Sequence, residues 1–169
     1  IDLTQYTQIC IFAASISIFK AINEKFNLED FEINCMFGHS LGEYSALAAS
    51  NKISINNASK LLKMRGEFMQ NTISPNTSTM AAIIGLTSKE VDNIINNNEL
   101  KVHIANDNSN KQVVISGLVK DIENSKQIFE NHGAKKFVIL KVSAAFHSPL
   151  MNEAQEKLKI LIDETDFDQ

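Results

Sequence analysis

The chain has 169 residues, of which 44% are hydrophobic and 21% are charged, and these proportions indicate a globular protein with a substantial core. The net charge of −4 at pH 7 excludes the basic surface that nucleic acids and anionic membranes require. The apolar run from Ile9 to Ile18 is too short to span a bilayer, and the four histidines show no metal-ligand spacing. Cys10 and Cys35 lie in apolar runs, which predicts buried, reduced thiols in an intracellular compartment.

The first part of the chain is expected to alternate helices with a single strand. In chain order, the patterns predict a helix over 4–26, a buried strand over 34–37, a helix over 41–50 and a helix that ends near 71. The first helix is apolar nearly all round, which is typical of a helix buried in a layered domain. Asn56 or Asn57 is the predicted N-cap of the last helix.

The run Gly38-His39-Ser40-Leu41-Gly42 connects the predicted strand to the helix after it. A strand, a sharp turn with a serine and a helix make the layout of a nucleophile elbow. Glycines beside the serine let the backbone close around it, and the helix N-terminus directs N–H groups at an oxyanion on the substrate. Ser40 and Glu43 also fit a capping box, in which Ser40 would be only an N-cap. Both roles remain open at this point.

Arg65 lies on the apolar stripe of the helix that ends near residue 71, together with Leu61, Leu62 and Phe68. A charge on a core face is unfavourable unless it meets an anion or reaches water. In one interpretation the aliphatic stem packs in the core while the guanidinium reaches solvent. In the other, the planar guanidinium binds the carboxylate of a ligand through two hydrogen bonds.

A break at residues 74–77 separates this part from a second pattern. The expected elements are a strand over 80–85, a helix over 88–95, strands over 101–105 and 112–117, a helix over 120–131 and a strand over 136–142. This β-α-β-β-α-β order predicts a ferredoxin-like subdomain over 77–143. It would be inserted in a larger α/β domain formed by residues 1–76 and 144–169.

His147 follows the last of these strands and precedes a final helix, with Ser148 as N-cap and Pro149 as first helical residue. Such junctions at a layer edge are where α/β proteins build sites, so His147 is a candidate general base. A lone histidine is more often structural or exposed, and His132, at a helix end, is expected to be exposed. His39 is expected to act through its backbone.

Four motifs occur in one order along the chain: Gly38-His39-Ser40-Leu41-Gly42-Glu43-Tyr44, Arg65-Gly66 with Met69-Gln70, Ala105-Asn106 with Asn108-Ser109, and Phe146-His147-Ser148 with Leu150-Met151. With these motifs the chain resembles the malonyl-CoA:acyl-carrier-protein transacylase family, to which polyketide acyltransferase domains are related. The resemblance covers nearly the whole chain. It implies a hydrolase-like α/β domain with a parallel sheet and a ferredoxin-like insert.

The resemblance also implies an enzyme that needs no cofactor and has malonyl-CoA and acyl carrier protein as partners. Binding to nucleic acid or to a membrane is not expected. The protein is expected to be a monomer in the cytoplasm, or in a plastid or the mitochondrial matrix if the source is eukaryotic.

The resemblance implies a role for each matching residue. Ser40 is the nucleophile that takes the acyl group as an ester, and His147 is its general base. Arg65 holds the free carboxylate of malonyl, and the backbone N–H of Leu41 supplies half of the oxyanion hole. Three further residues are implied in substrate binding: Met69, Asn108 and Phe146. Phe146 matches the bulky residue associated with malonyl rather than methylmalonyl selection.

Two parts of the family pattern have no match in the chain. One is an N-terminal strand with a Gly-Gln-Gly-x-Gln loop, which supplies the other oxyanion donor. The other is a C-terminal part with a glutamine near the serine and a carbonyl that orients the histidine. The sequence is therefore expected to be an internal piece of a transacylase, and turnover by these residues alone is not expected.

Lys135 and Lys136 form a basic pair at the start of the strand that leads to His147. In one interpretation they are a solvated turn after Gly133. In the other, they meet the acidic surface of the carrier or the phosphates of coenzyme A.

Two other functions fit parts of the pattern. A serine esterase or phospholipase would use the same elbow, although it would not need an arginine on a core face. An inactive fragment that only docks a carrier protein is the non-enzymatic alternative. Intact Ser40, Arg65 and His147 argue against a degenerate site.

Overall fold

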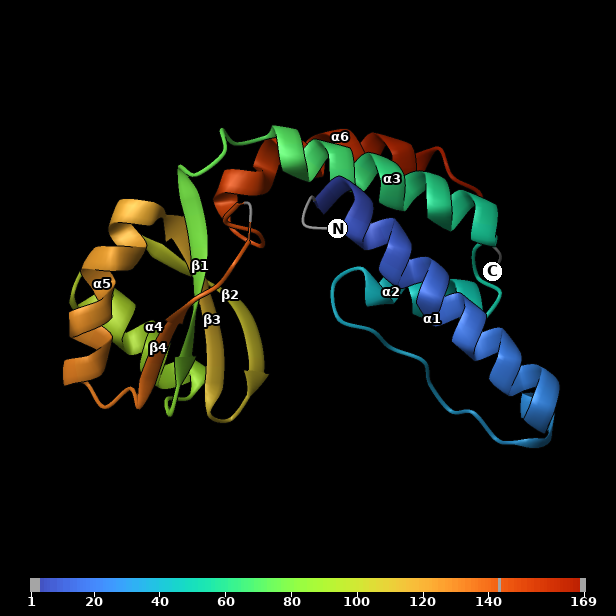
Figure 1. Cartoon of the computed structure of the whole chain (residues 1–169), viewed down its shortest axis with the longest axis horizontal. Helices are drawn as coiled ribbons and strands as arrows, with labels where there is room; N and C mark the ends of the chain where they lie inside the picture. Colours follow the sequence, from blue (N-terminus) through green and yellow to red (C-terminus); the bar gives the residue numbers. More distant parts are fainter. Residues whose placement is uncertain (1–3, 143, 168–169) are drawn as a thin grey trace. The chain divides into compact units, whose positions relative to one another are not determined.

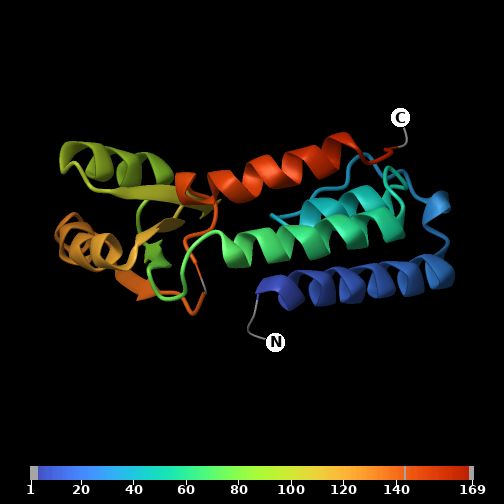
Figure 2. The same cartoon turned by 90° about the horizontal axis from the view of Figure 1, so that it is seen from above.

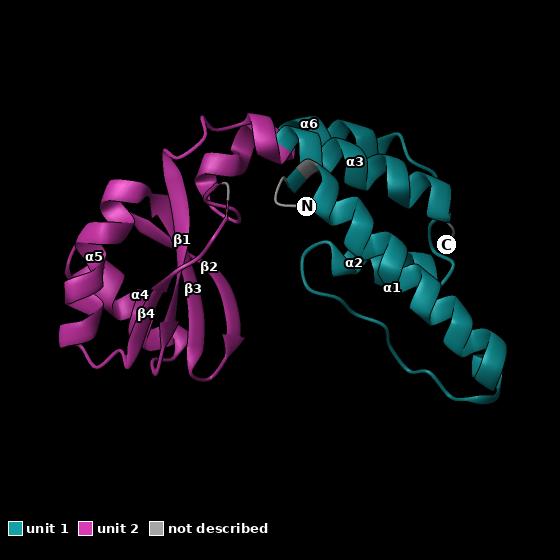
Figure 3. Ribbon diagram, in the orientation of Figure 1, with its two compact units in different colours: residues 1–68, 156–169 teal, residues 69–155 magenta. Residues whose placement is uncertain are grey.

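The computed structural model describes residues 4–142 and 144–167. The chain forms two compact units, one from residues 1–68 and 156–169 and the other from residues 69–155 (Figure 3). The smaller subdomain expected over 77–143 lies inside the second unit, which also takes in residues 69–76 and 144–155. The loop that carries His147 therefore belongs to the second unit.

The first unit is helical and is built from α1 (Thr4–Phe26), α2 (Gly42–Ala49), most of α3 (Ile55–Asn71) and most of α6 (Asn152–Asp163), with a short 3-10 turn, η1 (Leu28–Asp30). Figure 2 shows α3 running between α1 and α6. Apolar side chains from all four helices share one core. Its buried members are Phe12, Ile16, Ala48, Ile53, Ala58, Leu61 and Leu62.

The predicted bounds of α1 are confirmed, but the expectation that the helix is buried all round is wrong. Phe12 and Ile16 are buried, whereas Ile18 is 62% exposed. Among the described residues, the core formed with α2, α3 and α6 covers only one face of α1. Cys10 is exposed for the same reason, so its predicted burial is wrong too.

The strand expected over 34–37 is also a wrong prediction, because residues 32–38 have no regular secondary structure. A strand requires a neighbour that pairs with its N–H and C=O groups. None of the strands recorded in the described part of the chain pairs with this segment. Cys35 is consequently exposed rather than buried, and Phe37 is 89% exposed.

The start of α3 also differs from the prediction. The helix begins at Ile55, and the Ser54 hydroxyl oxygen accepts a hydrogen bond of 3.0 Å from the backbone N–H of Asn57. Ser54 therefore caps the helix, rather than Asn56 or Asn57.

The second unit has the predicted β-α-β-β-α-β order (Figure 1). Its elements are β1 (Ser78–Ile84), α4 (Ser88–Asn97), β2 (Val102–Ser109), β3 (Gln112–Leu118), α5 (Val119–Asn131) and β4 (Lys136–Ile139). The strands form one sheet in the order β2-β3-β1-β4, with every neighbouring pair antiparallel. This arrangement confirms the ferredoxin-like prediction. A short 3-10 turn, η2 (Pro149–Met151), then leads into α6.

The two faces of the sheet are packed differently. Helices α4 and α5 cover one face with a large apolar core that includes Ile83, Ile115 and Phe129. On the other face Met80, Ala82 and Val114 form a small cluster against which Leu140 and Phe146 pack. The alternation of side chains along β1 explains this division, since residues two apart lie on the same face.

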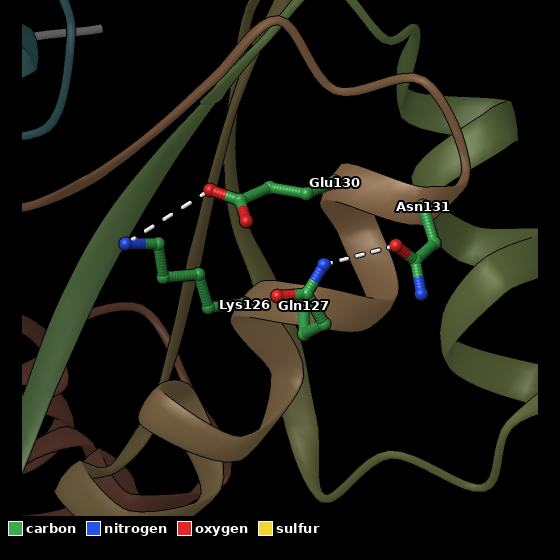
Figure 4. A network of polar contacts seen from close by, with 4 residues as sticks. All are labelled: Lys126, Gln127, Glu130 and Asn131. Carbon is green, nitrogen blue, oxygen red and sulfur yellow. Dashed lines mark hydrogen bonds and ion pairs between the residues drawn. The ribbon is translucent and has the colours of Figure 1, made fainter.

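Polar side chains cap α4 and line the exposed side of α5. Thr87 and Glu90 form a capping box at the N-terminus of α4. On α5, pairs spaced four residues apart line the exposed side, with Lys126 Nζ 3.9 Å from Glu130 and Gln127 donating to Asn131 over 2.9 Å (Figure 4). Each such pair contributes only about 0.2–0.5 kcal/mol. In the described part of the chain, no helix is both long and apolar enough to cross a membrane.

Candidate active site

The turn between residue 38 and α2 has the left-handed serine and the following helix of a nucleophile elbow, although residues 32–38 form no strand. Ser40 has a φ of 54°, a left-handed backbone conformation that residues other than glycine rarely adopt. A Cβ atom on Gly38 would lie 2.0 Å from the carbonyl carbon of Gly42, so only glycine fits at position 38. The turn is closed by a 2.9 Å hydrogen bond from the Gly42 N–H to the His39 carbonyl.

The second glycine of the motif has a different role from the one predicted. A Cβ atom on Gly42 would meet nothing within 4 Å, so no steric demand for glycine exists there in the described structure. The backbone of Gly42 is instead the surface that Gly38 approaches. The prediction that both glycines are needed for close approach therefore holds for Gly38 alone.

The capping-box alternative for Ser40 is not supported by the backbone. Residue Leu41, not Ser40, occupies the N-cap position of α2. A serine that caps a helix through its side chain typically has an extended backbone, whereas Ser40 is left-handed. The strained conformation lifts the Ser40 side chain out of the turn at the start of a helix, where a nucleophile would be placed.

Arg65 reaches Ser40 from α3. Its Nη2 donates a hydrogen bond of 2.9 Å to the Ser40 Oγ, and its Nη1 donates to the Oε1 of Gln8 on α1. The guanidinium is thus directed into the first unit, which excludes the interpretation that it only reaches solvent. The two bonds use two of the five N–H donors of the side chain.

Gln8 is the residue of this cluster that the sequence patterns did not identify. It is 4% exposed and lies on the same face of α1 as Phe12 and Ile16, at a spacing of four residues. A polar side chain in line with a buried apolar stripe was the available signal, and it is the same signal that identified Arg65.

The charges around Ser40 are partly desolvated. Burial lowers the pKa of Arg65 from its usual value, while the nearby Tyr44 and Glu43 act in the opposite direction. Burial raises the pKa of Tyr44, against the effect of the Arg65 charge. A guanidinium that donates to the serine oxygen does not itself use the hydroxyl hydrogen. It also favours negative charge that develops on that oxygen.

His147 lies in the second unit, in the loop between β4 and η2. It is exposed and, like Ser40, has a left-handed backbone, with a φ of 55°. The preceding Phe146 packs on the open face of the sheet. Ser148 occupies the N-cap position of η2 and Pro149 follows within its first turn, as predicted, but the Ser148 hydroxyl makes no capping hydrogen bond.

The remaining predicted residues divide between the units. Leu41 is half-buried beside Ser40 in the first unit, whereas Met69, Asn108 and Phe146 lie in the second. Met69 is buried and Asn108 is exposed. In the part of the chain that is described, no group of three or more His, Cys, Asp or Glu side chains could hold a metal ion.

Lys135 and Lys136 are exposed at one end of the four-stranded sheet. Lys136 lies opposite Ile84, the last residue of β1, whereas the loop before His147 contacts Ser78, the first residue of β1. Six steps along a strand correspond to about 20 Å. The two lysines therefore lie at the far end of the sheet from the anchor of the histidine loop.

Comparison with known proteins identifies one family. The family described as "Acyl transferase domain" matches residues 1–165 of the chain. The malonyl CoA-acyl carrier protein transacylase of Bacillus subtilis (strain 168) is 37% identical over 170 residues, which cover 99% of this chain and 52% of the relative. The chain thus spans about half the length of this relative.

Solved structures agree with this result. The malonyl CoA-acyl carrier protein transacylase of Coxiella burnetii matches with a TM-score of 0.91 and 35% identity, over 99% of this chain and 52% of that one. A type II polyketide acyl-carrier protein in complex with its malonyl-transacylase provides a second match, with a TM-score of 0.90 and 34% identity over 98% and 53% of the two chains.

Proposed function

The chain belongs to the acyl transferase domain family, and from this membership we propose that the protein containing it transfers a malonyl group from malonyl-CoA to the phosphopantetheine thiol of an acyl carrier protein. The observation that carries the proposal is the 2.9 Å hydrogen bond between Arg65 and Ser40 in the elbow. A carboxylate-binding cation beside an acyl-accepting hydroxyl suits a substrate with an acyl carbon and a free carboxylate at its two ends.

In the proposed first step, the Ser40 oxygen attacks the thioester carbon of malonyl-CoA while His147 accepts the hydroxyl proton. The carbonyl oxygen becomes negatively charged, and we propose that the N–H of Leu41, the N-cap residue of α2, donates to it. The carbon–sulfur bond then breaks, and the thiolate of coenzyme A leaves with the proton from His147. The product is a malonyl ester on Ser40.

In the second step the carrier thiol gives its proton to His147 and attacks the ester carbon. The bond to Ser40 breaks, and the serine oxygen recovers the proton. The thioester substrate supplies the activated acyl group, so the scheme requires no cofactor. Arg65 binds the malonyl carboxylate throughout both steps.

Substrate contacts and cellular setting are further parts of the proposal. Met69, Asn108 and Phe146 are proposed to line the malonyl pocket, with Phe146 favouring malonyl over the bulkier methylmalonyl. The protein is proposed to act as a monomer in the cytoplasm. A reducing compartment agrees with two exposed, unbridged cysteines.

The carrier can belong to fatty-acid or to polyketide synthesis. The matched complex contains a type II polyketide carrier and its malonyl-transacylase, which favours keeping the second possibility. The acyl chemistry is the same in both cases. The two possibilities are therefore distinguished by measuring which carrier, that of fatty-acid or that of polyketide synthesis, accepts the malonyl group faster.

The experiment that tests the proposal is intact-mass measurement of the full-length protein after brief exposure to malonyl-CoA. We expect one malonyl adduct in the wild type, and none in Ser40→Ala. Ser50→Ala is the matched control, because Ser50 lies exposed at the end of the same helix and should keep the adduct. An adduct that persists in Ser40→Ala, or a simple ester hydrolysed as fast as malonyl-CoA, would contradict the proposal.

A further inference from the structure

The loop that carries His147 is fastened to the sheet by contacts that the proposed mechanism does not use. β4 ends at Ile139, and one more ladder bond follows, from the Leu140 N–H to the Met80 carbonyl over 2.9 Å. Beyond this bond the chain leaves the regular pairing with β1. A further hydrogen bond between the two segments is made by a side chain at the first residue of β1.

That side chain is Ser78, which is 3% exposed. Its hydroxyl oxygen accepts a hydrogen bond of 3.0 Å from the backbone N–H of Ala145, which is 0% exposed. Ser78 lies on the same face of β1 as Met80 and Ala82, and this is the face on which Phe146 packs. The serine side chain therefore links the loop to β1 two residues before His147.

The carbonyl of Ala145 is held as well. Ser148 donates its hydroxyl to this oxygen over 2.8 Å. Both polar groups of the Ala145 backbone are thus hydrogen-bonded to serine side chains, the N–H to Ser78 and the carbonyl to Ser148. Between Ala145 and Ser148 lies His147 with its left-handed backbone, an unfavourable conformation that persists only where its surroundings impose it.

We infer that Ser78 is a positioning residue for His147. By accepting a hydrogen bond from the Ala145 N–H, Ser78 holds the loop in the conformation in which the His147 imidazole can act as the general base. The inference rests on the proposed role of His147 as general base. Ser78 does not touch substrate in this scheme, and it acts only through the backbone of the loop. Without it, a buried N–H would lose its partner, and the loop would relax to find another.

The test compares Ser78→Ala, Ser78→Thr and Ser125→Ala in the full-length protein. Ser125 is the matched control, because it is a buried serine of the same unit whose hydroxyl bonds a backbone carbonyl, that of Ile122 in α5. We expect Ser78→Ala to lower kcat for malonyl transfer about tenfold or more, with the KM for malonyl-CoA little changed. Ser78→Thr keeps the hydroxyl and should recover most of the rate, and Ser125→Ala should keep the wild-type kcat.

A second measurement does not depend on activity. In protein labelled at its histidines, the ring signals of His147, identified by their loss in His147→Asn, should be single and sharp in the wild type. In Ser78→Ala they should shift or broaden while the other histidine signals stay unchanged. If the wild type transfers no malonyl, the proposed function fails, and these ring signals still decide the role of Ser78.

Three results would overturn the inference. The first is a Ser78→Ala variant with wild-type kcat and unchanged His147 signals. The second is a loss of kcat in Ser125→Ala as large as the loss in Ser78→Ala. The third is a Ser78→Thr variant no better than Ser78→Ala. If Ser78→Ala cannot be purified folded, Ser148→Ala takes its place, since it removes the other hydroxyl bond to Ala145 and should produce the same change in the His147 signals.

Discussion

Arg65 forms contacts with two side chains, Ser40 and Gln8, that come from two other parts of the first unit. The Gln8 contact orients the guanidinium, because the side-chain carbonyl of Gln8 on α1 accepts a hydrogen bond from Arg65 Nη1. The Ser40 contact places the positive charge at the oxygen that is proposed to react. In the proposed mechanism, a single arginine thus binds a carboxylate and favours negative charge on the serine oxygen.

We predict that Arg65→Ala selectively impairs the use of malonyl-CoA. The free energy of activation for malonyl transfer should rise by about 2–5 kcal/mol, the range for removing one partner of a buried charge pair. Acetyl transfer should be affected much less, since acetyl offers no carboxylate. The measurement is kcat/KM with each donor, with the exposed Lys63→Ala on the same helix as control. Equal losses for both donors would make Arg65 a structural residue.

The sequence identified Ser40 and Arg65 but not Gln8 as members of one cluster. The motif around Ser40 and the misplaced charge of Arg65 are local signals, and each is visible in a single element. The contact with Gln8 joins residues 57 apart in the chain, so it depends on how α1 packs against α3. The burial of the cysteines was predicted wrongly for a related reason, because apolar neighbours in sequence do not specify which face of a segment is covered.

At the scale of elements, the elbow depends on the close approach of two backbone segments. We predict that Gly38→Ala destabilises the protein by ~1–3 kcal/mol and abolishes acylation, because its Cβ would overlap the Gly42 backbone and force the turn open. Gly42→Ala should leave stability nearly unchanged, since open space surrounds that position. Urea unfolding and the malonyl adduct are the two measurements. Equal effects of the two substitutions would argue against this turn geometry.

The N-terminus of α4 contains a carboxylate whose contribution to stability depends on pH. Hydrogen bonds from the backbone and hydroxyl of Thr87 lower the pKa of Glu90 from its usual value of 4.5. Because the folded pKa is lowered, Glu90 stabilises the folded state above its unfolded pKa, and this contribution is lost as the pH falls through the folded pKa. Glu90→Gln should therefore show a weaker loss of stability than the wild type on acidification below pH 4.5.

The measurement is the melting temperature as a function of pH for wild type and variant. Glu123→Gln, an exposed carboxylate within α5, is the control and should follow the wild type. Identical acid profiles for Glu90→Gln and the wild type would remove Glu90 from the capping interaction.

The order of the helices and of the strands in the small sheet could be predicted because each element has a local sequence pattern, although some boundaries differ, as at the end of β4, which stops at Ile139 rather than at residue 142. The bounds of α1 follow from its length of apolar sequence, and the order of strands in the second unit follows from turns and alternation within 77–143. The segment 34–37 could not be predicted in the same way. Its sequence has the composition of a buried strand, but pairing requires a neighbour, and none is recorded among the described residues.

At the scale of the whole molecule, the register of β1 with β4 separates two features that are close in sequence. Lys136 and His147 are eleven positions apart, but the strand between them carries the chain from one end of the sheet to the other. Any partner that meets the lysines therefore has to extend along the sheet to reach the histidine loop. A carrier protein with its thiol on a long flexible arm has this property.

We predict that Lys135→Glu combined with Lys136→Glu slows transfer to the carrier and flattens its dependence on salt. Steering by exposed charges is screened within about 10 Å at 0.1 M salt, so the effect should be largest at low ionic strength. Lys120→Glu combined with Lys126→Glu makes the same change of net charge on α5 and should leave transfer nearly unchanged. Carrier kinetics unaltered at every salt concentration would exclude Lys135 and Lys136 from the interface.

The left-handed backbones of Ser40 and His147 have a consequence for the evolution of this domain. Glycine adopts such dihedral angles without steric penalty, so glycine at either position would relieve local strain while removing a proposed catalytic group. Laboratory selection that rewards only heat resistance would therefore erode the site. Selection for turnover must continuously oppose that drift, and persistence of both side chains in an evolving population would be a record of retained catalysis.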